Sequence, residues 1–253
     1  GGSVVTGRTA DLVVVDDLKE FNVLEVYIAG EKVAENGRPL FQAEPKTDGL
    51  GIVPRDLSGR DMLLPAEGEK VSVRVIGVFP DRIESEGLIT DLPVSDGFIR
   101  AMPEQDILHL ALANRYANEV PVLGFIKGFG LKRGALATSV AHDSHHLLAV
   151  GASPEDMAAA LNAVSRSGGF AVCDGGKVSS LPLEVAGLMS ISPAAAVAKM
   201  ESDLLVALAD MGCRLPAPFM TLSFQSLLVV PELKIGDRGL FDTRRMEVVP
   251  PML

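Results

Sequence analysis

The stretch Ala137–Gly151, ATSVAHDSHHLLAVG, constrains the fold more than any other part of the chain. Apolar, β-prone runs stand on both sides of a short polar segment: Leu136–Ala141 before it and Leu147–Val150 after it. Such a pattern is typical of two strands joined by a short crossing. Three of the four histidines of the chain lie at this crossing, together with one aspartate. We therefore expect a sheet whose strand ends display imidazole and carboxylate groups.

Further strand-length runs and two helices are interspersed along the chain. The segment Lys70–Phe79 alternates apolar and polar residues as a half-buried strand does. A helix is predicted after Ser153, which can cap it, and it ends at Gly168-Gly169. A second long helix is expected from Ser192 to Met211. These elements predict a layered α/β (α+β) fold, in which a mixed β-sheet packs with helices.

The segment Asp106–Ala117, DILHLALANRYA, is predicted to be a helix. Its apolar residues recur at helical spacing from Ile107 to Leu112. His109 falls within this pattern. A single histidine on a helix is more often a packed or surface residue than a ligand, so no site is expected there.

Residues 1–58 are predicted to form a partial β-sandwich segment followed by a connector. Strand-length runs occur at Ala10–Asp16 and Val23–Ala29. A few short strands bury too little apolar surface to be stable alone, so this piece is expected to complete a larger sheet. The connector, Pro39–Leu57, is polar and rich in turn residues. Residues 59–253 are expected to form the main α/β domain.

Acidic residues outnumber basic ones, 33 to 23, which gives a formal net charge of −10. Nucleic acid and anionic membranes would repel such a chain, so neither is expected as a partner. No apolar run reaches the length of a membrane span, and no signal-peptide pattern opens the chain. Cys173 and Cys213 form no C-x-x-C pair and are expected to be buried free thiols. The low cysteine content suits a cytoplasmic location.

The polar crossing has the residues of a metal or hydrolytic site. His142 and His145 have H-x-x-H spacing, and Asp143 lies between them, so these three are candidate ligands for zinc, manganese or iron. Together with Ser144 they form the candidate catalytic loop. Adjacent residues of one loop cannot all face one ion, so some are expected to orient others or to reach an active site formed with another domain.

Two other interpretations of the loop stay open. The histidines can serve only as strand caps that hydrogen-bond backbone groups. A Ser-His-Asp hydrolase is a weaker hypothesis, because no G-x-S-x-G motif frames Ser139 or Ser144. The zinc nucleobase deaminases with H-x-E and P-C-x-x-C motifs are excluded, since neither motif occurs.

Four segments of the chain have a familiar order and spacing. They read RGALATSVAHDSHHLLAVG, SPEDMAAALNAVSRSGG, LPLEVAGLMS and PFMTLSFQSLLVVPELKIGDRGLFD. Together they resemble the C-terminal region of bacterial adenine deaminase, within the metal-dependent amidohydrolases, over Asp61–Leu253. The opening GRTADLVVVDDLKEFNVLEVYIAGEKVAENG is similar to the strand segment that follows the barrel in amidohydrolases. One departure is visible: the family's usual cluster is HDSHN, and His146 stands here in place of the asparagine.

The resemblance implies deamination of adenine to hypoxanthine with release of ammonia. In that reaction a metal-activated hydroxide attacks C6 of the purine. The metal would be held mainly by a catalytic barrel. It would be manganese or iron, with zinc as the alternative. No H-x-H pair occurs in this chain, and a barrel typically needs about 250 residues, so the chain is expected to be the region that follows the barrel. We expect the isolated chain to be inactive.

Three functional hypotheses follow. The first is a part of an adenine deaminase, with adenine as small-molecule partner and a homo-oligomeric assembly. The second is a non-catalytic module that serves assembly or oligomerisation. The third is a self-sufficient metallohydrolase that uses the HDSHH loop.

Overall fold

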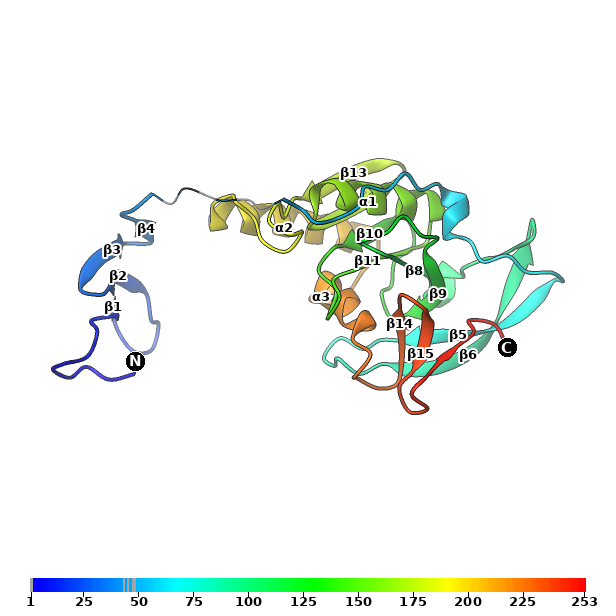
Figure 1. The fold of residues 1–253 in the computed structure, drawn as a ribbon, viewed down its shortest axis with the longest axis horizontal. Coiled ribbons are helices and arrows are strands. Elements are labelled where there is room, and N and C mark those ends of the chain that lie inside the picture. The colour runs from blue at the N-terminus through cyan, green and yellow to red at the C-terminus, as the bar shows by residue number, and fades with distance from the viewer. Residues whose placement is uncertain (1, 43, 45, 47–48) are drawn as a thin grey trace. The chain divides into compact units, whose positions relative to one another are not determined.

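The structure is a computed structural model that describes residues 2–42, 44, 46 and 49–253 (Figure 1). It contains two compact units, Gly1–Lys46 and Thr47–Leu253, which are described separately below. The predicted connector Pro39–Leu57 includes four residues outside the described ones, and the predicted division after residue 58 stays a prediction. Within the described ranges, no helix has both the length and the apolar character that crossing a membrane requires.

The N-terminal unit is a small antiparallel sheet with the strand order β1-β2-β3-β4. Its strands are β1 (Leu12–Val15), β2 (Val23–Ile28), β3 (Glu31–Glu35) and β4 (Arg38–Pro39). The turn between β3 and β4 is Asn36-Gly37, and both residues have a positive φ, as the tight turn of a hairpin requires. The two predicted strands of this segment are therefore present.

The main unit is built on a nine-stranded sheet with the order β13-β12-β10-β11-β8-β9-β5-β6-β7. Among its described pairs, β5 and β9 run parallel and the others antiparallel. The strands are β5 (Lys70–Gly77), β6 (Glu86–Ser95), β7 (Phe98–Ile99), β8 (Ile107–Ala113), β9 (Val122–Lys127), β10 (Ala135–Thr138), β11 (Leu147–Gly151), β12 (Phe170–Asp174) and β13 (Lys177–Leu181). The predicted mixed α/β fold is confirmed.

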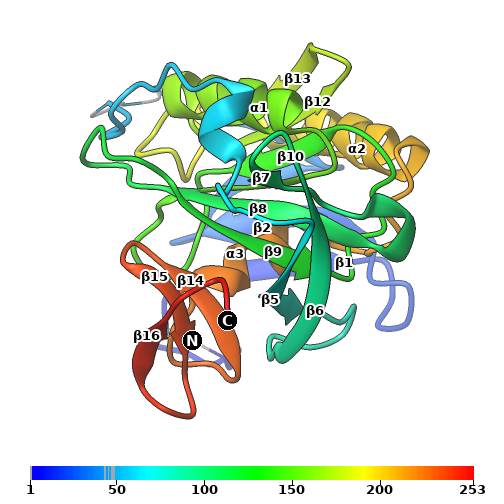
Figure 2. The same ribbon diagram turned by 90° about the vertical axis from the view of Figure 1, so that its right-hand side faces the viewer.

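One face of this sheet is covered by α1 (Pro154–Ser167), as Figure 2 shows. Ser153 caps the helix by accepting a hydrogen bond from the Asp156 N–H at 3.2 Å, and Gly168 ends it, as predicted. Beneath the helix the central strands present small side chains, among them Ala111, Ala137 and Ala149. Small residues let the helix approach the sheet closely, so that the larger apolar side chains of α1 fill the layer.

The opposite face carries larger side chains and is covered by later parts of the chain. Leu110, Leu136 and Leu148 point to this face and pack with residues of the remaining helices and of a small C-terminal sheet. These helices are α2 (Ala194–Asp210) and α3 (Pro218–Ser223), which a short 3-10 turn at Phe224–Ser226 follows. The sheet consists of β14 (Leu233–Gly236), β15 (Gly239–Asp242) and β16 (Glu247–Val249). The long second helix predicted after Ser192 is present as α2.

The predicted helix over Asp106–Ala117 is wrong, because this segment contains β8. All seven residues of β8 are buried, since the strand lies between β11 and β9 and both of its faces are covered. Burial on both faces removes the alternation that marks a half-exposed strand. A run of leucine and alanine then has the spacing and propensity of a helix, and only its tertiary surroundings make it a strand.

Candidate active-site loop

The loop Ser139–His146 connects β10 to β11, which pair in an antiparallel register. The predicted arrangement of strand, polar crossing and strand is confirmed. The start of the loop is fixed by Ser139, whose Oγ donates to the Gly187 carbonyl at 2.6 Å and accepts from the Gly169 N–H at 2.7 Å. Both flanking strands are fully buried, so the loop is held on rigid ends.

The middle of the loop rests on α3 and the 3-10 turn that follows it. The His142 N–H donates to the Ser223 carbonyl at 3.2 Å, and the Ser226 hydroxyl donates to the His142 carbonyl at 2.7 Å. The ring of His142 lies beside that of Phe224, with 5.0 Å between the ring centroids. Residues far apart in the sequence therefore hold the backbone on which the candidate side chains stand.

Arg115, just after β8, supports the other half of the loop. This side chain is only 4% exposed. Its guanidinium donates to the carbonyl oxygens of His145 at 3.1 Å and of Leu50 at 3.1 Å. It also donates to the carbonyls of Ala186 at 2.5 Å and of Gly51 at 3.4 Å. One buried cation thus ties the segments at Leu50 and Ala186 to the loop through backbone oxygens.

Two histidines of the loop have a defined orientation. His145 Nδ1 accepts the Ala141 N–H and His146 Nδ1 accepts the Arg115 N–H, each at 3.2 Å. A ring nitrogen that accepts a hydrogen bond carries no proton, so each neutral ring has its proton on Nε2. Burial, together with the nearby charges of His142 and Arg115, lowers the pKa of His145 below its usual value. Burial likewise lowers the pKa of His146. Both rings are therefore neutral Nε2–H donors.

Exposure differs sharply along the loop. Asp143 and Ser144 are exposed, His142 and His145 are partly exposed, and His146 is only 6% exposed. The rings of His142 and His145 are 5.8 Å apart between centroids. His145 also has a φ of +52°, in the left-handed region that non-glycine residues seldom occupy. The side chains predicted to do chemistry are therefore the accessible ones, and His146 is structural.

The loop does not form a complete metal site. Among the described residues, no group of three or more histidine, cysteine, aspartate or glutamate side chains is arranged to hold a metal ion. The Nδ1 atom of His145 is already occupied by the hydrogen bond from Ala141. A catalytic metal usually needs three protein ligands, and this donor set falls short. The loop alone therefore does not supply a complete catalytic metal centre.

Sequence reasoning did not identify Arg115 as part of this region. Its signal was present, because a charged residue stands two positions after the end of the run Ile107–Ala113. An arginine at the end of a buried strand has to find hydrogen-bond partners nearby. Its partners, at Leu50, Ala186 and His145, come from segments whose proximity only the fold creates.

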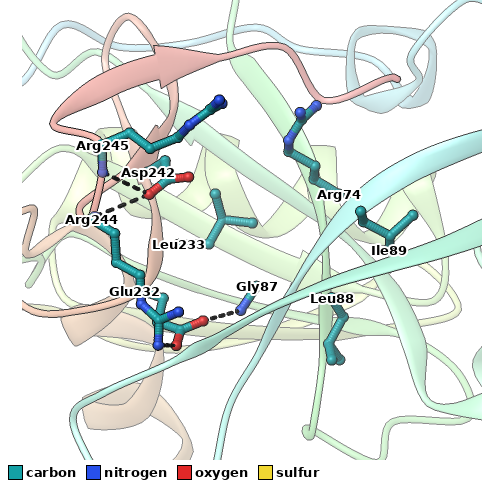
Figure 3. A pocket seen from close by; sticks show the side chains of 9 residues that line it. All are labelled: Arg74, Gly87, Leu88, Ile89, Glu232, Leu233, Asp242, Arg244 and Arg245. Atoms are coloured by element: carbon teal, nitrogen blue, oxygen red, sulfur yellow. Dashed lines mark hydrogen bonds and ion pairs between the residues drawn. The ribbon is translucent and has the colours of Figure 1, made fainter.

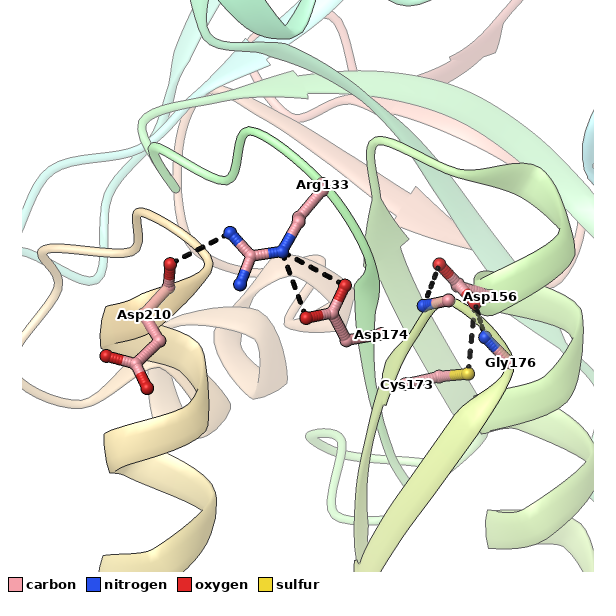
Figure 4. A network of polar contacts seen from close by, with 7 residues as sticks. Arg133, Asp156, Cys173, Asp174, Gly176 and Asp210 are labelled. Atoms are coloured by element: carbon pink, nitrogen blue, oxygen red, sulfur yellow. Dashed lines mark hydrogen bonds and ion pairs between the residues drawn. The ribbon is translucent and has the colours of Figure 1, made fainter.

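The other polar groups singled out in the sequence lie elsewhere. His109 is buried in β8 beside Phe125, and its Nε2 accepts the Ala101 N–H at 3.3 Å. Both cysteines are buried free thiols, as predicted. Cys173 donates to the carboxylate of Asp156 (Figure 4), and burial followed by this contact raises its pKa to about 12. Such a thiol is unreactive at neutral pH.

Comparison with known proteins agrees with the resemblance of the motifs. A family model described as the adenine deaminase C-terminal domain matches residues 82–247. Proteins named adenine deaminase from Methanothermobacter thermautotrophicus and Salinibacter ruber are 44% and 42% identical to this chain, over 98% of the chain and 46% of their own length. The chain thus spans about half the length of the curated relatives that it matches. It belongs to the adenine deaminase C-terminal domain family.

Proposed function

We propose that this chain is the C-terminal half of an adenine deaminase, which converts adenine and water into hypoxanthine and ammonia. In this proposal the loop Ser139–His146 contributes to the active site, and a divalent metal held mainly by a preceding barrel supplies the hydroxide. Family membership and the share of each relative that is matched support it.

The observation that carries the proposal is the contrast between the fixed backbone of the loop and its accessible side chains. Hydrogen bonds from Arg115, Ser139 and Ser226 hold the backbone of the loop in place. The side chains of Asp143 and Ser144 nevertheless do not pack in the interior, because they are exposed. Accessible polar groups on a rigid support, next to a residue with a positive φ, are typical of functional sites.

We assign the following roles within the proposal. His145 presents its Nε2–H to a purine nitrogen, because its Nδ1 is already paired. Asp143 and Ser144 exchange protons or hydrogen bonds with the exocyclic amine or the attacking water. Direct metal ligation by His142, Asp143 and His145 stays a prediction, and none of these roles depends on it.

The same proposal includes the setting of the enzyme. Adenine is its small-molecule partner, manganese, iron or zinc is its metal, and the enzyme is a homo-oligomer in the cytoplasm. The net charge of −10 supports the exclusion of nucleic acid and anionic membranes as partners.

The test measures adenine turnover by the full-length enzyme that carries this chain. We expect His145→Ala to lower kcat/KM by about 100-fold, the lower range for loss of a catalytic proton-transfer group, with the thermal unfolding curve retained. The matched control is His109→Gln, which alters a buried histidine outside the loop. Turnover of His142→Ala and His145→Ala within twofold of the parent, in folded protein, would remove the loop from the mechanism and favour a non-catalytic assembly module.

A further inference from the structure

A cavity of about 260 Å³ lies between the β5–β6 hairpin and the C-terminal sheet (Figure 3). Its apolar lining consists of Leu88, Ile89 and Leu233. Three arginines and two carboxylates form the polar part of the lining: Arg74, Arg244, Arg245, Glu232 and Asp242. None of the residues of the loop Ser139–His146 lines it.

The walls of this cavity are tied together by backbone hydrogen bonds. On one side the Ser85 N–H donates to the Pro231 carbonyl at 2.8 Å, and the Glu232 N–H donates back to Ser85 at 3.0 Å. On the other side the Arg74 N–H donates to the Pro251 carbonyl at 2.8 Å. The two sheets therefore keep a fixed separation, and the cavity is a built feature of the fold.

Two of the arginines converge. Figure 3 shows the guanidinium groups of Arg74 and Arg245 pointing toward one another across the cavity. Nη1 of Arg74 is oriented by the carbonyls of Pro250 at 2.8 Å and Met252 at 3.3 Å, and within the described part of the chain no carboxylate pairs with this residue. Arg245 reaches Glu247 through Nη1 at 3.1 Å. Like charges that face each other repel, and an anion between them removes that cost.

The carboxylates of the lining, Asp242 and Glu232, are not the anion between Arg74 and Arg245. Asp242 accepts the backbone N–H groups of Arg244 and Arg245 at 3.0 and 3.1 Å, which fixes the turn that carries both arginines. Glu232 pairs with Arg244 and accepts the Gly87 N–H at 3.2 Å. Both carboxylates therefore orient the site, Glu247 pairs with Arg245 from outside the lining, and Arg74 keeps a guanidinium that no carboxylate of the described residues pairs with.

We propose that this cavity binds the phosphoryl group of a small phosphorylated molecule between Arg74 and Arg245. Guanidinium groups bind phosphate oxygens through paired hydrogen bonds, and a tetrahedral phosphoryl group offers oxygens to two guanidiniums that approach from opposite sides. The apolar side chains of Leu88 and Leu233 would contact the rest of the molecule. A phosphomonoester with a compact organic body fits this combination better than a free inorganic ion.

The test is a titration of the whole chain, by calorimetry, with adenosine 5′-monophosphate, inorganic phosphate and adenosine in parallel. We expect saturable binding of the monophosphate, weaker binding of phosphate and none of adenosine. Arg245→Ala should weaken binding by about tenfold or more, the loss of one charge-assisted contact pair. Arg245 is exposed, so the variant keeps the fold, and Arg74→Lys gives a second variant that retains the charge but loses the paired geometry.

Arg214→Ala is the matched control, because it removes an exposed arginine that does not line the cavity. It should change the affinity less than twofold. If inorganic phosphate bound as tightly as the monophosphate, the assignment of a phosphomonoester as the ligand would be wrong, and the free ion would be the ligand. Absence of saturable binding by either anion, or equal affinities of Arg245→Ala and Arg214→Ala, would overturn the site.

Discussion

The two ends of the β10–β11 pair are both polar, but they are built differently. At the end near Gly151, Asp156 is 6% exposed and accepts the Gly176 N–H at 2.8 Å and the Cys173 thiol at 3.1 Å (Figure 4). There each buried carboxylate oxygen is used inside the fold. At the other end Asp143 and Ser144 face solvent on a loop whose backbone is fixed by buried partners. Polar groups that serve the fold are buried and paired, and those available for chemistry are left accessible.

The largest effect is expected for Arg115→Met. The substitution removes a buried cation and leaves four backbone carbonyls without their donor. We expect the free energy of unfolding to fall by about 3 kcal/mol or more, because unpaired buried polar groups are costly. Denaturant unfolding measures this change.

Arg133→Met is the control at the other end of the strand pair. Arg133 is half exposed and contacts Asp174 and the Asp210 carbonyl (Figure 4). An exposed ion pair contributes little, so its loss should cost less than about 1 kcal/mol. Equal losses for the two variants would contradict the structural role of Arg115.

A smaller effect on the free energy of unfolding is expected when the pH is lowered, because of His109. This residue pairs with Gly151 in the neighbouring strand. Burial, and the charge of Arg100 to a lesser degree, lower the pKa of His109 to about 4 from 6.5. Between these values the unfolded chain binds the proton and the folded chain does not, so stability falls as the pH decreases from 6.5 toward 4. Because of this histidine, we expect the free energy of unfolding to be about 2 kcal/mol lower at pH 4.5 than at pH 7.

The His109→Gln variant isolates that contribution, because glutamine can accept the Ala101 N–H without titrating. Unfolding of both proteins is measured at the two pH values. If the parent and the variant lose the same stability on acidification, the buried neutral state of His109 is wrong.

A still smaller effect is expected for Asp156→Asn. Burial raises the pKa of Asp156, but hydrogen bonds from Gly176, Cys173 and Gly175 outweigh it and lower the pKa below 3.8. The carboxylate therefore stabilises the fold above that pH, and the contribution is lost as the pH falls further. An asparagine loses one of these acceptor sites, which should cost about 1 to 2 kcal/mol at pH 7.

Asp174→Asn provides the comparison for this substitution, because Asp174 is partly exposed and pairs with Arg133. Its unfolding free energy should change by less than about 0.5 kcal/mol. Thermal unfolding at pH 7 compares the two variants. A loss for Asp156→Asn no larger than that for Asp174→Asn would show that the buried network adds nothing.

The sequence predicted the parts of this architecture that depend on local chemistry. Ser153 and the Gly168 terminus mark α1, because the cap and the end of a helix depend on neighbouring residues. It failed for β8, whose identity depends on burial by strands and layers from distant segments. The structural role of Arg115 could not be predicted for the same reason, because its hydrogen-bond partners come together only in the folded chain.

The central proposal is that accessible residues of the loop Ser139–His146 serve catalysis while its buried residues serve the fold. The most direct measurement compares Asp143→Asn with Asp174→Asn in the full-length enzyme, recording adenine turnover and thermal unfolding together. We expect both variants to unfold like the parent, Asp143→Asn to lose about 100-fold in kcat/KM, and Asp174→Asn to stay within twofold. Turnover by Asp143→Asn within twofold of the parent, with unfolding unchanged, would contradict the claim.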